Sequence, residues 1–333
     1  MKKGDVWFFE KDIYIKEYAS CVGVKEGEGP LRDGFDVIGE DDRFGESTWE
    51  KAECRMFETA CRKAVEKSGL SDGDIGCLIG GDLLNQCIST SFAARNLGFK
   101  TLGVYGACST MAESMALGAA LIEAGLEEYV LCAASSHFCT AERQYRYPLE
   151  YGGQRPQTSQ WTATACGAVI LGKEGKVKVT AACPGRVFDP GVRDVNNMGA
   201  AMAQAAYETI SRYFKDGGKK PEDHDLIVTG DLSAVGAAIV DKLFGLDGIT
   251  LGERYNDCGL MLFDRQKQDV HSGGSGCGCS AAVLCARILP RIIKHELKKV
   301  LFCPTGALLS PLSAAQGESI PGICHLICLE DAV

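Results

Sequence analysis

Cys108 lies in the segment Tyr105–Gly125 (YGACSTMAESMALGAALIEAG), between a turn of small residues and a predicted amphipathic helix. A thiol at a helix N-terminus feels the positive end of the helix dipole, which favours the thiolate and hence a nucleophile. Ser109 continues the same turn, whose free N–H groups attract a carboxylate. The position therefore suits two chemistries, covalent catalysis by Cys108 and binding of an anion.

Other polar side chains that could reach this cysteine follow predicted strands or lie in a glycine-rich loop. Asp82 and His137 each come directly after an apolar strand, and α/β proteins form their sites at the carboxyl ends of strands. His271 and Ser275 lie in DVHSGGSGCGCSAA, whose glycines can bring backbone N–H groups close to an anion. Asp82 either faces Cys108 or caps a helix. The two histidines either line a pocket or hydrogen-bond to backbone.

A segment rich in arginine and aromatic residues supplies candidates for holding a carboxylate. A guanidinium group can bind a carboxylate through two hydrogen bonds, and a nearby aromatic face adds a flat wall. Arg155 and Trp161 are the principal candidates. The alternative for such a segment is a dimer contact or ion pairs with the many acids. Its members are Arg143, Tyr145, Arg146, Tyr147, Tyr151, Gln154, Arg155 and Trp161.

The elements that must position these residues occur twice in the chain. The helical segments 46–69 and 198–215 are each followed by a turn, an apolar strand and the tripeptide Gly-Asp-Leu, which begins at Gly81 and again at Gly230. Cys108-Ser109 and Cys279-Ser280 each open a helix that leads to another strand. Two matches in the same order indicate an internal duplication.

Each half has the pattern strand–helix–strand–helix–strand. The strands are uniformly apolar, as expected when both faces of a sheet are covered. The sequence therefore predicts an α/β fold with two similar halves, residues 1–174 and 175–333, because a new strand begins at KVKVT.

Composition narrows the function. The net charge of −9 argues against a nucleic-acid surface. Seventeen cysteines lie scattered through apolar segments, without the spacing of a zinc site, and are expected to be buried thiols. No signal peptide or apolar span is apparent, so we expect synthesis in the cytoplasm and membrane attachment only through partner proteins.

The motifs YGACSTMAES, SSHFCTAERQYRYPLEYGGQRPQTSQWT and HSGGSGCGCSAA resemble the thiolase superfamily and, within it, the stage V sporulation protein AD (SpoVAD) family. The resemblance implies stacked αβαβα layers, a homodimer, and no cofactor. It also implies binding of dipicolinic acid (pyridine-2,6-dicarboxylate) and its uptake at the forespore inner membrane with other SpoVA proteins, which links the chain to spore germination. Ca²⁺ is expected only as part of a calcium–dipicolinate ligand.

The resemblance also bears on catalysis. Condensing enzymes and thiolases pair their cysteine with two further groups, and one of them is a histidine at a place occupied here by Gly230 and Asp231. Loss of a general base costs about 10²–10⁴-fold in rate. We therefore expect a non-catalytic binding protein. The alternative is an acyltransferase with Cys108 as nucleophile and His271 as its base.

Overall fold

Two groups of five strands, with the same internal order, form the frame of the molecule. The computed structural model describes residues 1–145 and 153–332. The first group consists of β3 (Tyr14–Val22), β5 (Cys77–Gly81), β6 (Thr101–Gly103), β7 (Val130–Ser136) and β9 (Ala165–Gly172). The second consists of β10 (Val177–Cys183), β11 (Leu226–Thr229), β12 (Tyr255–Asp257), β14 (Lys299–Cys303) and β17 (Leu326–Asp331).

The two groups repeat one topology. Their strand orders are β6-β5-β7-β9-β3 and β12-β11-β14-β17-β10. In each group the first three strands are parallel and the last two are antiparallel to their neighbours. This correspondence is the structural form of the duplication that the sequence predicts.

The groups meet where β10 pairs with β3, through Val177 opposite Ile15 and Lys178 opposite Tyr14. The predicted boundary after residue 174 falls in the turn between β9 and β10. The N-terminal strands depart from that division. Strand β2 (Val6–Phe8) pairs with β1 (Lys2–Lys3) and with β10 of the second group.

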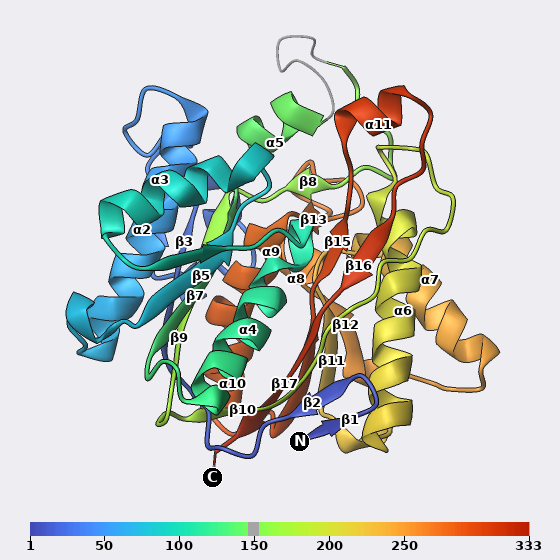
Figure 1. The fold of residues 1–333 in the computed structure, drawn as a ribbon. Helices are drawn as coiled ribbons and strands as arrows, with labels where there is room; N and C mark the ends of the chain where they lie inside the picture. Colours follow the sequence, from blue (N-terminus) through green and yellow to red (C-terminus); the bar gives the residue numbers. More distant parts are fainter. Residues whose placement is uncertain (146–152, 333) are drawn as a thin grey trace.

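Helices cover both groups on both faces (Figure 1). The outer face of the first group packs against α2 (Trp49–Ser68) and α3 (Ile88–Leu97), and that of the second against α6 (Met198–Gly217) and α7 (Ser233–Leu246). Between the groups lie α4 (Thr110–Ala124) and α9 (Cys277–Val283), which continues through a π-turn (Leu284–Ile288) into α10 (Leu289–Ile293). The sequence predicts that this helix opens at Cys279-Ser280, and α9 begins two residues earlier, at Cys277.

Three hydrophobic cores follow from this layering. Successive residues of a strand point to opposite faces, so one strand serves two cores. In β14, Val300 and Phe302 belong to the central core, whereas Leu301 and Cys303 face α6 and α7. Every one of these four side chains is fully buried, which explains the uniformly apolar strands.

Short elements complete the described chain. They are α1 (Val24–Gly27), β4 (Val37–Ile38), α5 (Phe138–Tyr145), β8 (Trp161–Thr162), α8 (Cys258–Leu262), β13 (Gly274–Ser275), β15 (Thr305–Ala307), α11 (Pro311–Ala315) and β16 (Gly322–Cys324), together with single 3₁₀ turns. Strand β8 pairs with β13, and β15 pairs with β16. Among the helices of the described residues, none is both long and apolar enough to cross a membrane.

Candidate functional site

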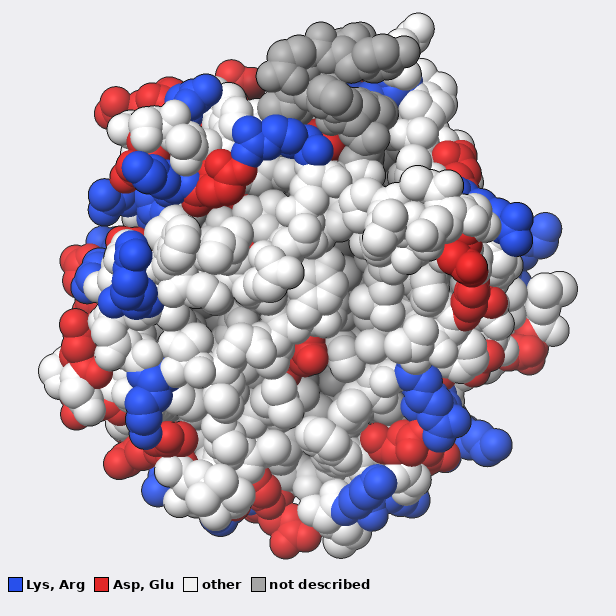
Figure 2. Space-filling model, turned by 45° about the horizontal axis from the view of Figure 1, so that its top comes forward, with Lys and Arg blue, Asp and Glu red and all other residues white. Residues whose placement is uncertain are grey.

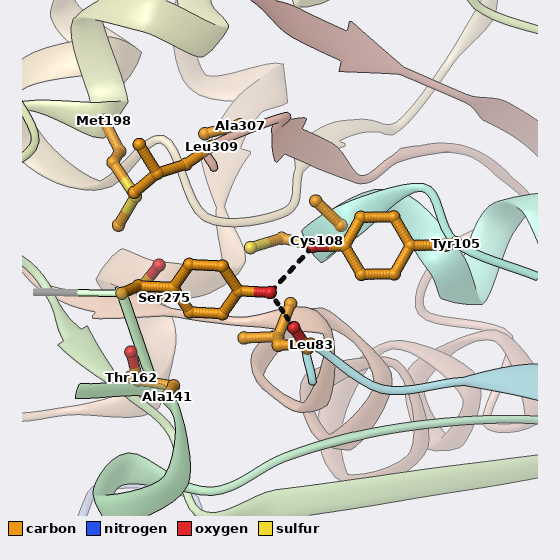
Figure 3. Close-up of a pocket in the computed structure, with 11 residues that line it drawn as sticks. Leu83, Tyr105, Cys108, Ala141, Thr162, Met198, Ser275, Ala307 and Leu309 are labelled. Carbon is orange, nitrogen blue, oxygen red and sulfur yellow. Dashed lines mark hydrogen bonds between the residues drawn. The ribbon is translucent and has the colours of Figure 1, made fainter. Parts of the chain in front are cut away.

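A pocket lies between the two halves, above the N-terminus of α4 (Figure 3). The space inside it, counted together with the part that is open to solvent, measures about 400 Å³. Most of its walls are apolar. The first half contributes Leu83, Tyr105, Ala107, Cys108, Ala141, Tyr145 and Thr162, and the second contributes Met198, Ser275, Ala307 and Leu309.

A tight turn holds Cys108 at the pocket. The 3₁₀ turn Ala107–Ser109 leads directly into α4, and Ala107 takes a left-handed conformation with φ of 48°. The Ser109 hydroxyl donates to the Gly106 carbonyl (2.7 Å), which ties the turn together and leaves Ser109 outside the pocket lining. Gly306 of β15 presses on the turn from the other half, since a Cβ there would lie 2.2 Å from the Gly106 oxygen. Both halves thus fix the Cys108 backbone.

Asp231 lies directly beside the Cys108 thiol and hydrogen-bonds to it. The carboxylate also accepts from the Gly276 N–H (2.9 Å) and the hydroxyls of Ser275 (3.1 Å) and Thr305 (2.9 Å). Burial, which disfavours the charged form, raises the pKa of Asp231 to about 7 despite these donors. The aspartate that occupies the expected histidine position is therefore part of the cysteine's own environment.

The thiol of Cys108 is poorly suited to ionise. Burial raises the pKa of Cys108 well above its usual value, and the Asp231 carboxylate raises it further. Hydrogen bonds from Gly276 and Ser275 oppose this shift without reversing it. The helix N-terminus, which favours a thiolate on sequence grounds, is outweighed by desolvation and by a neighbouring acid.

Within the described part of the chain, no histidine lines the pocket. The His137 ring shares a hydrogen bond with the Asp42 carbonyl through Nε2 (2.7 Å) and accepts from the Cys139 N–H through Nδ1 (3.1 Å). The His271 Nε2 lies 3.4 Å from the Asp269 carboxylate. His137 and His271 thus have the backbone and ion-pair contacts of structural residues, and neither is placed beside Cys108.

Two tyrosines bring hydroxyl groups over the pocket. The Tyr105 and Tyr145 hydroxyls lie 3.0 Å apart, and the Tyr145 hydroxyl also donates to the Leu83 carbonyl (Figure 3). Tyr145 ends α5, and Tyr105 precedes the Cys108 turn. With Thr162 and Ser275 they supply the neutral hydrogen-bonding groups of an otherwise apolar space.

Asp82 has a different role from its counterpart Asp231. Its carboxylate accepts from the Leu84 N–H (2.8 Å) and the Thr90 N–H (2.7 Å), which caps the first turn of α3. It is fully buried and does not line the Cys108 pocket. Burial raises the pKa of Asp82, and burial together with the neighbouring Asp82 raises the pKa of Glu53 to about 8.

Arg155, Trp161 and His271 come together, but on the other side of the β8–β13 ribbon from Cys108. Trp161 and Thr162 are adjacent in β8 and so point to opposite faces, and Thr162 is the one that lines the pocket. Arg155 and His271 both contact Asp269. Arg146, Tyr147 and Tyr151, which belong to the same predicted segment, lie outside the described residues.

The described residues contain no cluster of three or more His, Cys, Asp or Glu side chains arranged to hold a metal ion. Cys277 donates to the Ser135 carbonyl (2.8 Å), and His325 Nδ1 accepts from the Gly185 N–H (3.1 Å). Sixteen of the seventeen cysteines are buried and Cys139 is partly buried, all as free thiols.

This fold is that of the thiolase-like class of proteins. OleA with bound cerulenin from Xanthomonas campestris superposes with a TM-score of 0.66 at 14% identity, covering 99% of each chain. The 3-oxoacyl-[acyl-carrier-protein] synthase III of Aquifex aeolicus gives 0.57 at 14% identity, covering 96% of this chain and 99% of its own. These likenesses confirm the predicted α/β, thiolase-like fold.

Sequence similarity places the chain more narrowly. The profile of the stage V sporulation protein AD family (SpoVAD) matches residues 3–330. The stage V sporulation protein AD of Bacillus subtilis (strain 168) is 42% identical over 327 residues, which are 98% of this chain and 96% of that protein. The chain belongs to the stage V sporulation protein AD family and thus to the proteins of sporulation.

Several pocket residues have no signal in the sequence. They are ordinary apolar residues of helices, a turn and the region where β15 ends, namely Ala107, Ala141, Met198, Ala307 and Leu309. The Thr305 hydroxyl donates to Asp231 because β15, which begins just after β14, lies beside Asp231, and this contact has no signal in the sequence. Tyr145 belongs to the predicted aromatic segment, and its place over the pocket follows from the length of α5.

Proposed function

We propose that this chain is a non-catalytic protein of sporulation that binds dipicolinic acid in the Cys108 pocket and supports its uptake into the forespore with other SpoVA membrane proteins. Membership of the stage V sporulation protein AD family supports the sporulation role. The observation that best supports non-covalent binding is the position of Asp231 beside Cys108, where a condensing enzyme is expected to have a histidine, because the Asp231 carboxylate raises the pKa of the thiol.

An acyl transfer would begin with a thiolate, and the surroundings of Cys108 oppose one. The pKa of the thiol is raised by burial and by Asp231, whereas the pKa of Asp231 is about 7. A proton therefore stays on the sulfur rather than passing to the carboxylate. No histidine of the described residues lines the pocket, so Asp231 is the group left to act as a base, and its carboxylate binds a proton more weakly than the Cys108 thiolate does.

The same groups suit a flat ligand with carboxylates. The apolar side chains Leu83, Met198 and Leu309 can pack against a pyridine ring. The hydroxyls of Tyr105 and Tyr145 can turn from each other toward a carboxylate oxygen. The N-terminus of α4 adds favourable potential for a negative group. Asp231, when protonated, adds no opposing charge.

The test is calorimetric titration of the full chain with dipicolinate, with and without Ca²⁺, and with pyridine-2-carboxylate as the control ligand. We expect saturable heat that is selective for the dicarboxylate. Ala141→Leu and Ala307→Val, which fill the pocket from either half, should weaken binding at least about tenfold, because the ligand must then displace a packed side chain. Leu246→Ala, at a side chain exposed on α7, is the matched control and should leave binding unchanged.

Absence of heat with dipicolinate would overturn the binding proposal. Incubation with acyl-CoA followed by intact mass measurement then tests the alternative. An added acyl group that is lost in Cys108→Ala would establish an acyltransferase, whereas an unchanged mass would exclude covalent transfer from that donor.

We also propose a homodimer, attached peripherally to the forespore inner membrane through partner proteins. Three large apolar side chains, Phe92, Leu102 and Tyr105, are exposed on α3, on the edge strand β6 and in the loop after it. The face that Figure 2 turns toward the viewer is largely uncharged in its middle, with charged side chains around its rim. An unpaired strand edge with apolar neighbours is a surface suited to pairing with a second copy.

A further inference from the structure

Behind the β8–β13 ribbon, two cationic side chains share one aromatic ring. The Lys25 ammonium nitrogen lies 3.5 Å from the centroid of the Trp161 ring, and the Arg155 guanidinium carbon lies 4.8 Å from it. Phe138 stacks on the same indole at 3.7 Å between centroids. Trp161 thus brings two like charges together, an arrangement that calls for a compensating anion.

The described residues provide incomplete compensation. The Lys25 Nζ and the Arg155 Nη2 both donate to the Asp269 carbonyl, at 3.0 and 3.1 Å. The Asp269 carboxylate lies 3.0 Å from the Arg155 Nη2, but its side chain is 73% exposed and therefore screened by water and salt. Asp269 is thus the carboxylate that both cations share, and Glu26 and Glu28 also favour the charged form of Lys25.

Arg155 carries the clearest sign of a missing ligand. Its side chain is only 10% exposed, and its Nη1 is buried with no hydrogen-bond partner among the residues that the structure describes. A buried unpaired donor on a charged group is costly, and a guanidinium presents its donors as a planar fork that fits two oxygens of one anion. Burial also lowers the pKa of Lys25, and the neighbouring Arg155 acts in the same direction.

We propose that Lys25 and Arg155, held by Trp161, form a binding site for an oxyanion, a carboxylate or a phosphate group, on the face of the β8–β13 ribbon opposite the Cys108 pocket. The oxyanion occupies the free Nη1 of Arg155 and approaches the Lys25 ammonium. The site does not depend on dipicolinate binding at Cys108. The site and the pocket are separated by the ribbon itself. Trp161 precedes Thr162 in β8 and pairs with Gly274 of β13, whereas Thr162 and Ser275 line the pocket.

Fluorine NMR of the full chain labelled with fluorotryptophan tests the site, with the Trp161 signal assigned by Trp161→Phe. Inorganic phosphate and acetate are titrated separately at constant ionic strength set with NaCl, so that the two arms distinguish the two oxyanion sources. We expect the Trp161 signal to shift and saturate with at least one of them. The signals of Trp7 and Trp49 should stay constant.

Variants separate a built site from general charge attraction. Arg155→Gln should weaken the response at least about tenfold, because a charge-assisted hydrogen bond is lost. Lys25→Gln should weaken it as well, and it serves if Arg155→Gln fails to fold. Arg265 is an exposed cation in the loop that contains Asp269, and Arg265→Gln should leave the response intact.

A shift that is linear in concentration, or one equal in Arg155→Gln, Lys25→Gln and the unmodified chain, would overturn the proposal. Ala141→Leu distinguishes this site from the pocket. If dipicolinate still shifts the Trp161 signal in that variant, the Lys25–Arg155 site binds the dicarboxylate independently of the Cys108 pocket. If no oxyanion binds at the Lys25–Arg155 site, the calorimetric test of the Cys108 pocket is unaffected.

Discussion

Replacing Asp231 by asparagine should change how the stability of the protein depends on pH. The pKa of Asp231 is about 7 in the folded chain, against 3.8 for an unperturbed aspartate. The folded protein therefore holds a proton at this position between pH 4 and pH 7 that the unfolded chain has released. Stability from this group is complete below about pH 4 and is lost as the pH rises toward 7.

The size of the effect follows from the shift. Each pKa unit corresponds to about 1.4 kcal/mol, so the full shift is worth about 4 kcal/mol. Because the group is half titrated at pH 7, about 2 kcal/mol is lost between pH 5 and pH 7, and the loss reaches about 3 kcal/mol by pH 8. Asparagine resembles the protonated acid and does not titrate. Its oxygen can keep the bonds from Gly276 and Ser275, and its amide can donate to the Thr305 hydroxyl once that group rotates.

The assay is urea unfolding of the original chain and of Asp231→Asn at pH 5, 6, 7 and 8. We expect the variant to gain about 3 kcal/mol relative to the original chain between pH 5 and pH 8. Comparing the two proteins at each pH cancels the titration of other buried acids such as Glu53. Asp33→Asn, at an exposed carboxylate, is the control and should show no such gain. A difference that is the same at pH 5 and pH 8 would refute the buried, protonated Asp231.

Three further substitutions test other parts of the structure. Asp82→Ala leaves the Leu84 and Thr90 N–H groups without an acceptor and should lower the free energy of unfolding by about 2 kcal/mol in urea, and an unchanged midpoint would contradict the capping role. Gly306→Ala places a Cβ 2.2 Å from the Gly106 oxygen and should lower the free energy of unfolding, measured thermally, by about 1–3 kcal/mol. Gly245→Ala is its control and should not destabilise the protein, because nothing lies within 4 Å of the added carbon. Leu102→Lys puts a charge on the exposed edge strand β6 and should convert the proposed dimer to monomers in light scattering, so a variant of unchanged mass would remove β6 from the interface.

The sequence predicts the architecture well because duplication and burial leave local patterns. The repeated Gly-Asp-Leu and the apolar strands suffice to predict two α/β halves. The site is harder, because Asp82 and Asp231 occupy matching positions and yet have different partners. Asp82 meets the first turn of α3, whereas Asp231 meets Ser275, Gly276 and Thr305 from distant segments. Such contacts depend on tertiary packing, which no local pattern encodes.

The grouping of Arg155, Trp161 and His271 illustrates a second limit. The composition of the segment indicates that an arginine and an aromatic ring lie together, and they do. Which face of β8 carries the tryptophan depends on register, and a shift of one residue exchanges the two faces. That register is set by pairing with β13, more than a hundred residues further along the chain, so the sequence does not place the cluster relative to Cys108.

The pairing of β2 with β10 constrains the order in which the chain can fold during translation. Phe8 lies opposite Ala181, so β2 leaves the ribosome roughly 170 residues before its partner, a delay of about 10–35 s at about 5–20 residues per second. The strands β3 to β9 can assemble in that interval, while β2 has only β1 as a partner. The docking of β2 on β10, together with the ion pairs from Asp5 to Arg186 and Arg212, is therefore a late step that joins an early strand to the later half.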